Sequence, residues 1–114
     1  MSAVPTELGT PWAVLARAIS ERRPVRARYH GYGRVLCPHV LGWKNGRPKV
    51  LAYQTRGATS SGPLPVQPEQ RWRSLYVDEI EDATIAWDCA WQTADNYTAS
   101  SNCIDEVALS IHSS

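Results

Sequence analysis

The spacing of the apolar residues changes at Pro24, and this change limits the chain to a helix followed by a β-rich body. Upstream of Pro24, apolar side chains recur at i, i+3, i+4 and i+7, on one face of a helix: Trp12, Leu15, Ala16 and Ile19. Thr10 and Pro11 are favoured at the cap and first turn of such a helix, and Pro24 ends it. Downstream the period becomes two, which is typical of strands with one buried face.

The residues after Pro24 predict about five short strands joined by hairpins. Pro38 predicts an edge, a bulge or a break in the second strand. Asn45-Gly46 is a strong hairpin signal, because both residues tolerate a positive φ. The predicted strands cover residues 25–30, 34–43, 49–54, 71–77 and 84–87, with turns at 31–33 and 78–81 and a loop at 56–70.

This order of elements favours a mainly β fold, a small SH3-like or Sm-like antiparallel barrel of about five strands preceded by one N-terminal α-helix. With 114 residues, of which 43% are apolar and 20% charged, one domain with one core is expected. We expect a flexible N-terminus at 1–9, the helix and barrel at 10–87, and an acidic C-terminal extension at 88–114, packed on or beside the barrel. Within that extension, residues 105–111 are compatible with a strand or a helical turn.

Cysteine usage and hydropathy point to a cytoplasmic protein. The three cysteines, Cys37, Cys89 and Cys103, are odd in number and irregularly spaced, so no disulfide framework is predicted. Residues 1–9 lack the basic and apolar stretches of an export signal. The sequence also lacks any run of 18 apolar residues, so it predicts no membrane span.

Charge is strongly segregated along the chain, although the net charge is only +1. All 12 Lys and Arg lie between Arg17 and Arg73, where only Glu21 and Glu69 are acidic, so this segment carries +10 and the remainder −9. Two interpretations stay open. The acidic remainder folds back and neutralises the basic segment, or the basic segment forms a patch for a phosphate-bearing partner.

Four segments between residues 25 and 85 resemble the WYL domain family in their order and spacing. They are Val25-Arg26-Ala27-Arg28-Tyr29, Arg34-Val35-Leu36-Cys37-Pro38-His39-Val40-Leu41, Val50-Leu51-Ala52-Tyr53 and Arg73-Ser74-Leu75-Tyr76-Val77-Asp78-Glu79-Ile80. WYL domains show a strand ending in Tyr, an Arg-x-x-x-Pro-x-x-Leu strand, a Trp-Tyr-Leu-like strand after a hairpin, and an Arg-x-Phe-Arg-Leu-Asp-Arg-Ile signature.

The departures from the WYL pattern concern its naming residues and its arginines. Lys49 and Val50 stand where the Trp and Tyr would be, and Tyr76 and Glu79 replace two signature arginines. The resemblance implies an Sm-like barrel that senses nucleotides, oligonucleotides or single-stranded nucleic acid through a basic pocket. It also implies a role in transcription regulation, DNA-damage responses or phage defence, here as a free-standing module without the usual helix-turn-helix domain.

The candidate ligand-binding residues are basic or aromatic: Arg26, Arg28, Arg34, His39, Tyr53, Arg71 and Arg73. Arg73 is the leading candidate because the resemblance singles it out and a guanidinium suits phosphate recognition. Its alternative role is a structural pair with Asp78 or another acid. For His39 the alternative is a buried ring bonded to backbone, and for Tyr53 it is a core position in a chain without Phe.

The sequence predicts neither a metal site nor an enzyme. The cysteines and histidines lack the paired spacing of a zinc site, and no nucleophile stands at a recognisable distance from a base. We expect no cofactor. The sequence favours a ligand-sensing module that binds a nucleotide or single-stranded nucleic acid through a basic barrel face. The alternative is a protein-interaction or oligomerisation module without a small ligand.

Overall fold

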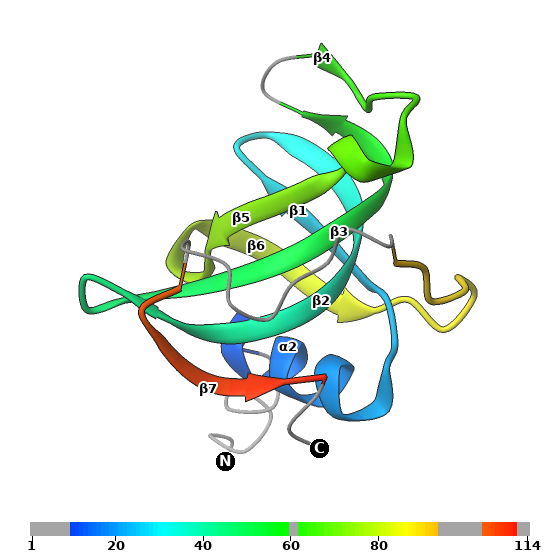
Figure 1. Ribbon diagram of the computed structural model, residues 1–114. Coiled ribbons are helices and arrows are strands. Elements are labelled where there is room, and N and C mark those ends of the chain that lie inside the picture. Colours follow the sequence, from blue (N-terminus) through cyan, green and yellow to red (C-terminus); the bar gives the residue numbers. More distant parts are fainter. Residues whose placement is uncertain (1–9, 60–61, 94–103, 112–114) are drawn as a thin grey trace.

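The computed structural model describes residues 10–59, 62–93 and 104–111, so the N-terminus predicted to be flexible lies outside the described residues (Figure 1). The first described element is helix α2 (Pro11–Glu21), as predicted. The Thr10 hydroxyl caps it by accepting a hydrogen bond from the Ala13 N–H at 3.2 Å. Arg22 ends it in the left-handed conformation, with a φ of 51°. This helix is too short to span a membrane, and no other helix in the described ranges is long enough.

The rest of the described chain is mainly β, which confirms the predicted class. All the ladders are antiparallel. The described strands are β1 (Val25–Tyr29), β2 (Tyr32–Lys44), β3 (Arg47–Thr59), β4 (Gly62–Pro63), β5 (Trp72–Tyr76), β6 (Ile80–Ile85) and β7 (Glu106–Ser110), with 3₁₀ turns η1 (Pro68–Gln70) and η2 (Val77–Glu79).

The central strands run in the order β5-β3-β2-β1-β6, while β4 adds to β3 and β7 adds to β2. The two outer strands of this order, β5 and β6, are joined by η2, and no ladder pairs them in the part of the chain that the structure describes. The sheet is therefore open between β5 and β6, and the predicted SH3-like or Sm-like barrel is not confirmed.

The turn between β1 and β2 differs from the predicted one at 31–33. Tyr29 pairs with Tyr32, so the turn consists of His30 and Gly31, both with positive φ. The second hairpin is as predicted, with positive φ at Asn45 and Gly46. The observed turn is one residue shorter than the predicted one and begins one residue earlier, so the pairing of β2 with β1 shifts by three residues. Because this shift is odd, it moves each β2 side chain to the opposite face of the sheet.

Two predicted boundaries were wrong. Strand β3 continues to Thr59, past the predicted start of the loop, since Gly57 packs against Gly33 of β2 so closely that a Cβ there would lie 2.1 Å from the Gly33 carbonyl oxygen. Strand β6 begins at Ile80 rather than at residue 84. A bulge does interrupt the β2–β3 ladder between Pro38 and Val40, in line with the proline signal.

The main core lies between α2 and one face of the sheet, which we call the inner face. It combines the buried helix side chains with residues of β1, β2, β3, β5 and β6, among them Leu15, Ile19, Leu36 and Val50. In Figure 1, α2 lies beneath the sheet, and the β1–β2 turn and β4 lie at the other end of the molecule. Strand β7 shows that the C-terminal segment packs on the sheet, pairing with β2 through residues 40–43.

Candidate anion-binding site

Three polar side chains lie on the inner face of the sheet, which is otherwise apolar. Arg34 of β2 pairs with the core residue Ala27, and Gln54 of β3 pairs with the core residue Leu36. Arg73 of β5 pairs with Ala52 of the same core. Because partners in a ladder share a face, Arg34, Gln54 and Arg73 all face inward from three adjacent strands.

The guanidinium of Arg34 is buried and poorly satisfied. The residue is only 4% exposed. One terminal nitrogen donates to Gln54 Oε1 at 3.4 Å and the other to the Tyr29 carbonyl oxygen at 3.3 Å, both longer than usual for N–H···O bonds. The Arg34 Nε is buried without any hydrogen-bond partner. Most of the donor capacity of this cation is thus unused.

Gln54 of β3 accepts a hydrogen bond from Arg34, and its own orientation is set by the backbone. Gln54 is fully buried, and its Nε2 donates to the Arg56 and Ala58 carbonyl oxygens at 3.0 and 3.1 Å. These two bonds orient the amide so that Oε1 faces Arg34. Gln54 continues the inner-face alternation of Val50 and Ala52, so a polar residue where that pattern expects an apolar one is the sequence signal that would have identified it.

Arg73 resembles Arg34 in having a buried Nε without a partner. One of its terminal nitrogens donates to the Gln70 and Trp72 carbonyl oxygens at 3.2 and 3.0 Å. The structural pairing considered for Arg73 is not present, because Asp78 instead accepts from Arg47 at 2.8 Å. Arg73 is half-buried, and this burial lowers the pKa of its guanidinium.

The two arginines form a cationic pair without a counter-ion. Within the described ranges, no carboxylate forms an ion pair with either Arg34 or Arg73. Burial, followed by the charge of Arg73, lowers the pKa of the Arg34 guanidinium. Buried cations without a partner oppose folding, and a bound anion would offset the two charges and satisfy the unmet donors.

Two tyrosines flank Arg34. Its guanidinium carbon lies 5.2 Å from the centre of the Tyr29 ring and 6.0 Å from that of the Tyr32 ring. The hydroxyl of Tyr29 donates to Glu79 and accepts from the Tyr76 N–H, so this ring is held in place. Tyr32 is 40% exposed and offers a ring face beside the buried cation.

The structure places Arg26 and Arg28 on the opposite face, which we call the outer face. Both alternate with the core residues of β1. Arg26 pairs with Asp88 through two contacts of 3.3 Å, and Arg28 pairs with Glu81 and Asp82. They do not converge with Arg34 and Arg73. Acids of β6 and the segment after it neutralise them, so the fold-back interpretation of the charge segregation holds for this part of the chain.

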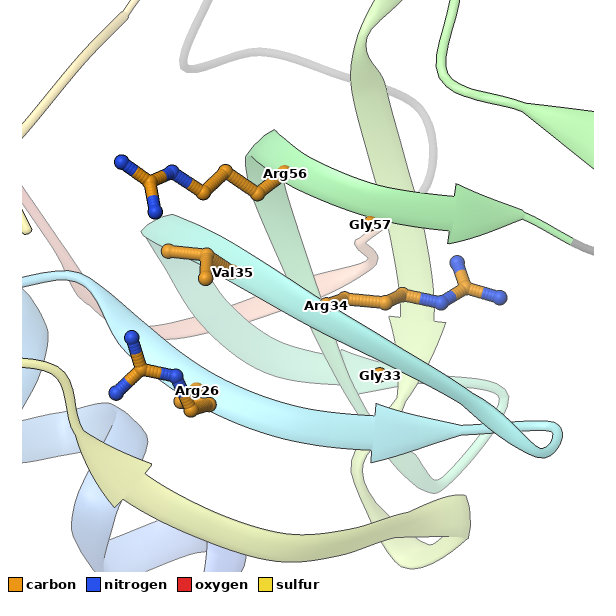
Figure 2. Close-up of a pocket in the computed structure, with 6 residues that line it drawn as sticks. All are labelled: Arg26, Gly33, Arg34, Val35, Arg56 and Gly57. Carbon is orange, nitrogen blue, oxygen red and sulfur yellow. The ribbon is translucent and has the colours of Figure 1, made fainter.

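A groove of about 210 Å³ lies on the outer face, between Arg26 and Arg56 (Figure 2). Arg34 contributes to the lining, but Figure 2 shows its side chain extending from β2 away from Arg26 and Arg56. This groove and the Arg34–Arg73 pair are therefore two separate features on opposite faces of the same strands.

His39 and Tyr53 belong to an aromatic cluster rather than to the arginine pair. Tyr53 lies between the inner-facing Ala52 and Gln54, so it faces outward, and its ring meets the Trp72 ring edge-on at 5.2 Å. The His39 ring is fully buried beside Trp72 and Trp91, with Nδ1 2.7 Å from the Cys37 carbonyl oxygen and Nε2 2.9 Å from the Thr93 hydroxyl. Both positions match the structural alternatives considered for them.

Arg71 holds a loop. Its guanidinium donates to the Pro65 carbonyl oxygen at 2.7 Å and to that of Val66 at 3.3 Å. The Arg71 carbonyl oxygen also accepts from the Gln54 N–H at 2.9 Å, which connects this loop to the strand that carries Gln54. Arg71 thus supports the arrangement around the arginine pair through the backbone.

The described residues contain no group of three or more His, Cys, Asp or Glu that could hold a metal ion. Burial raises the pKa of the Cys37 thiol to about 11, so this cysteine stays protonated at neutral pH. Cys103 lies outside the described residues.

Comparison with known proteins gives no relative for this chain: no family model, no curated protein and no solved structure matches it. The resemblance to the WYL domain family stays a prediction.

Proposed function

We propose that this protein is a ligand-binding module that holds an anionic, phosphate-bearing ligand against Arg34 and Arg73. The observation that supports this most strongly is the pair of buried Nε–H donors, one on each arginine, which have no hydrogen-bond partner among the described residues. In the same ranges neither arginine forms an ion pair with a carboxylate. A phosphate offers charge and several acceptor oxygens at once, so it suits two guanidinium groups that lie on the same face of the sheet.

The proposed ligand is a nucleotide or a short single-stranded nucleic acid. Tyr32 is exposed beside Arg34 and supplies a surface on which a base can stack, an interaction that contributes about 1–3 kcal/mol per base. Inorganic phosphate would use only the arginines. This ligand class agrees with what the WYL resemblance implies, and such a module would act as a sensor rather than as an enzyme.

The fold that we propose for this module is a partly open SH3-like or Sm-like barrel. Its two outer strands, β5 and β6, follow each other in the chain and are separated only by η2, which brings the sheet edges back toward each other. Bulges in the β1–β6 and β2–β3 ladders add the curvature that such a return needs. In this arrangement, the helix covers the core and the arginine pair faces the interior of the curved sheet.

A binding screen tests the proposal. Single-stranded DNA, single-stranded RNA and mononucleotides are titrated into the full chain at two salt concentrations. We expect binding that weakens as salt increases, because phosphate contacts release counter-ions. Absent or salt-independent binding to all of these ligands contradicts the proposal.

Charge reversal locates the site. Arg73→Glu replaces one of the two cations with a carboxylate on the same face as Arg34, with which it can pair. Because charge-assisted hydrogen bonds contribute about 1.5–3 kcal/mol, we expect at least about a tenfold loss of affinity in a folded protein. Arg17→Glu on α2 makes the same change in net charge far from the pair and should leave affinity nearly unchanged. Equal effects of the two variants would indicate a non-specific charge effect.

The alternative, a protein-interaction or oligomerisation module, predicts a different result. A salt-dependent oligomer with no affinity for nucleotides, measured by light scattering, would favour an interaction module. The ion pairs within the chain reduce the charge difference on which that alternative depends, because Arg26, Arg28 and Arg47 already have acidic partners.

A further inference from the structure

The outer face carries a row of three residues across adjacent strands. Arg26 of β1 pairs with Val35 of β2, and Val35 pairs with Arg56 of β3, so the two arginines flank one small apolar side chain. Figure 2 shows both guanidinium groups on the same side of the sheet, with Val35 between them. Both arginines are exposed.

The floor of the groove beside this row is made of backbone. Gly33 and Gly57 line it, and neither has a side chain to fill it. Gly57 has a φ of 97°, and a Cβ there would lie 2.1 Å from the Gly33 carbonyl oxygen, so no other residue fits at this position without a shift of the strands. The glycines keep the groove open and allow a ligand to approach between the arginine side chains.

An acidic residue, Asp88, pairs with one of the two arginines that line the groove. Asp88 accepts from both terminal nitrogens of Arg26 at 3.3 Å, and Arg56 also acts on it through its charge. Arg56 itself forms no ion pair with any carboxylate in the described ranges. The side chain of Asp88 is 71% exposed, so the pair with Arg26 is a solvated one that contributes little stability.

We propose that the groove between Arg26 and Arg56 binds a phosphate group, and that Asp88 occupies the anion position in the unliganded protein. The carboxylate engages Arg26 only, whereas a phosphate has enough oxygens to accept from both guanidinium groups. The ligand displaces Asp88 from Arg26. This site differs from the proposed Arg34–Arg73 site in its ligand-holding arginines, Arg26 and Arg56, which lie on the opposite face of the sheet, although Arg34 also contributes to the lining of the groove.

Titration of the full chain with inorganic phosphate tests this proposal by NMR. The reporters are the backbone amides of Gly33 and Gly57 and the Nε–H of Arg56, at an ionic strength matched with sodium chloride. We expect these signals to shift on titration, and Asp88→Asn to strengthen binding by up to about fivefold, because an exposed pair is worth at most about 1 kcal/mol. Arg56→Gln should abolish the shifts, while Arg47→Gln, which alters an exposed arginine elsewhere, should not.

A second titration with adenosine 5′-monophosphate distinguishes free phosphate from a phosphate carried by a nucleotide. Equal shifts from the two ligands assign recognition to the phosphate group, and larger shifts from the nucleotide extend the site to the attached group. The proposal is overturned if the signals stay fixed in both the native chain and Asp88→Asn. It is also overturned if Arg73→Glu abolishes the shifts, because the signal would then come from the inner face.

Discussion

Arg73 has an unusual position for a charged residue, half-buried on an inner face that is otherwise mostly apolar, with an unmet Nε–H and a second arginine nearby. Such a residue opposes folding unless an anion is bound. A methionine of similar length would fill the same space without a charge.

Arg73→Met therefore separates binding from stability. We expect the free energy of unfolding to stay the same or to rise by about 1 kcal/mol, because the substitution removes an unpaired charge and its repulsion with Arg34. Leu75→Ala, on the same strand and the same face, should lower it by about 2–5 kcal/mol through the cavity that it leaves. Urea denaturation measures both. A large destabilisation by Arg73→Met would show that Arg73 has a structural role.

Glu79 gives a pH dependence whose sign follows from its partners. Hydrogen bonds from His30 and then from Arg47 lower the pKa of Glu79 below the 4.5 of an unperturbed Glu. The stability that it contributes is complete above pH 4.5 and is lost as the pH falls through the lower pKa of the folded state.

Urea midpoints measured from pH 6 to pH 3 test this effect. The native chain should lose stability below pH 4.5 more steeply than Glu79→Gln, because the amide has no proton to take up. Parallel curves for the two proteins would show that Glu79 does not couple to folding.

At the scale of elements, the attachment of β7 to β2 depends on one glycine. A Cβ at Gly42 would lie 1.9 Å from the Glu106 carbonyl oxygen and 2.8 Å from the Ile104 side chain. Ile111, the residue after β7, accepts a hydrogen bond from Arg22, whose terminal nitrogen donates to its carbonyl oxygen at 2.6 Å. The C-terminal segment is thus connected to both the sheet and the end of α2.

Gly42→Ala should release β7 while the central strands remain paired. We expect the amides of β7 to lose hydrogen-exchange protection and those of β1 and β3 to keep it, since local openings follow cooperative units. Gly33→Ala is the matched control, because a Cβ there meets no atom within 4 Å. Uniform loss of protection in Gly42→Ala would mean that β7 is part of the global unfolding unit.

The elements with strong local signals could be predicted from the sequence. Thr10-Pro11 marked the start of the helix, and Asn45-Gly46 marked a hairpin, because these residues determine backbone conformation by themselves. The extension of β3 to Thr59 could not be predicted, since it depends on the contact between Gly57 and Gly33 from a different strand. The start of β6 at Ile80 likewise depends on its pairing with Tyr29.

Of the candidate site, the sequence predicted Arg34 and Arg73 but not their arrangement. A three-residue turn at 31–33 would have placed Arg34 on the same face as Arg26 and Arg28, whereas the observed two-residue turn places it on the opposite face. An odd shift in the β1–β2 register therefore separates one large basic patch from two smaller sites. Gln54 was not predicted as a site residue, because a single Gln in a strand stands out only once the residues on the same face are recognised as buried.

At the scale of the whole molecule, the charge segregation of the sequence becomes a set of ion pairs between distant segments. Asp88 meets Arg26 and Asp105 meets Lys44, so acids of the C-terminal part lie on basic residues of β1 and β2. Among the described residues, the cations that form no ion pair with a carboxylate include Arg34 and Arg73 on the inner face and Arg56 on the outer face. The molecule thus neutralises much of its basic segment and leaves the proposed sites charged.

The most direct test of the central claim is the NMR signal of the Arg34 and Arg73 Nε–H groups during titration with a mononucleotide. If the nucleotide occupies the pair, both signals shift and their exchange with solvent slows, because two unpartnered donors acquire acceptors. If the nucleotide binds while both signals stay unchanged, or does not bind at all, the account of Arg34 and Arg73 as the ligand-holding pair is contradicted.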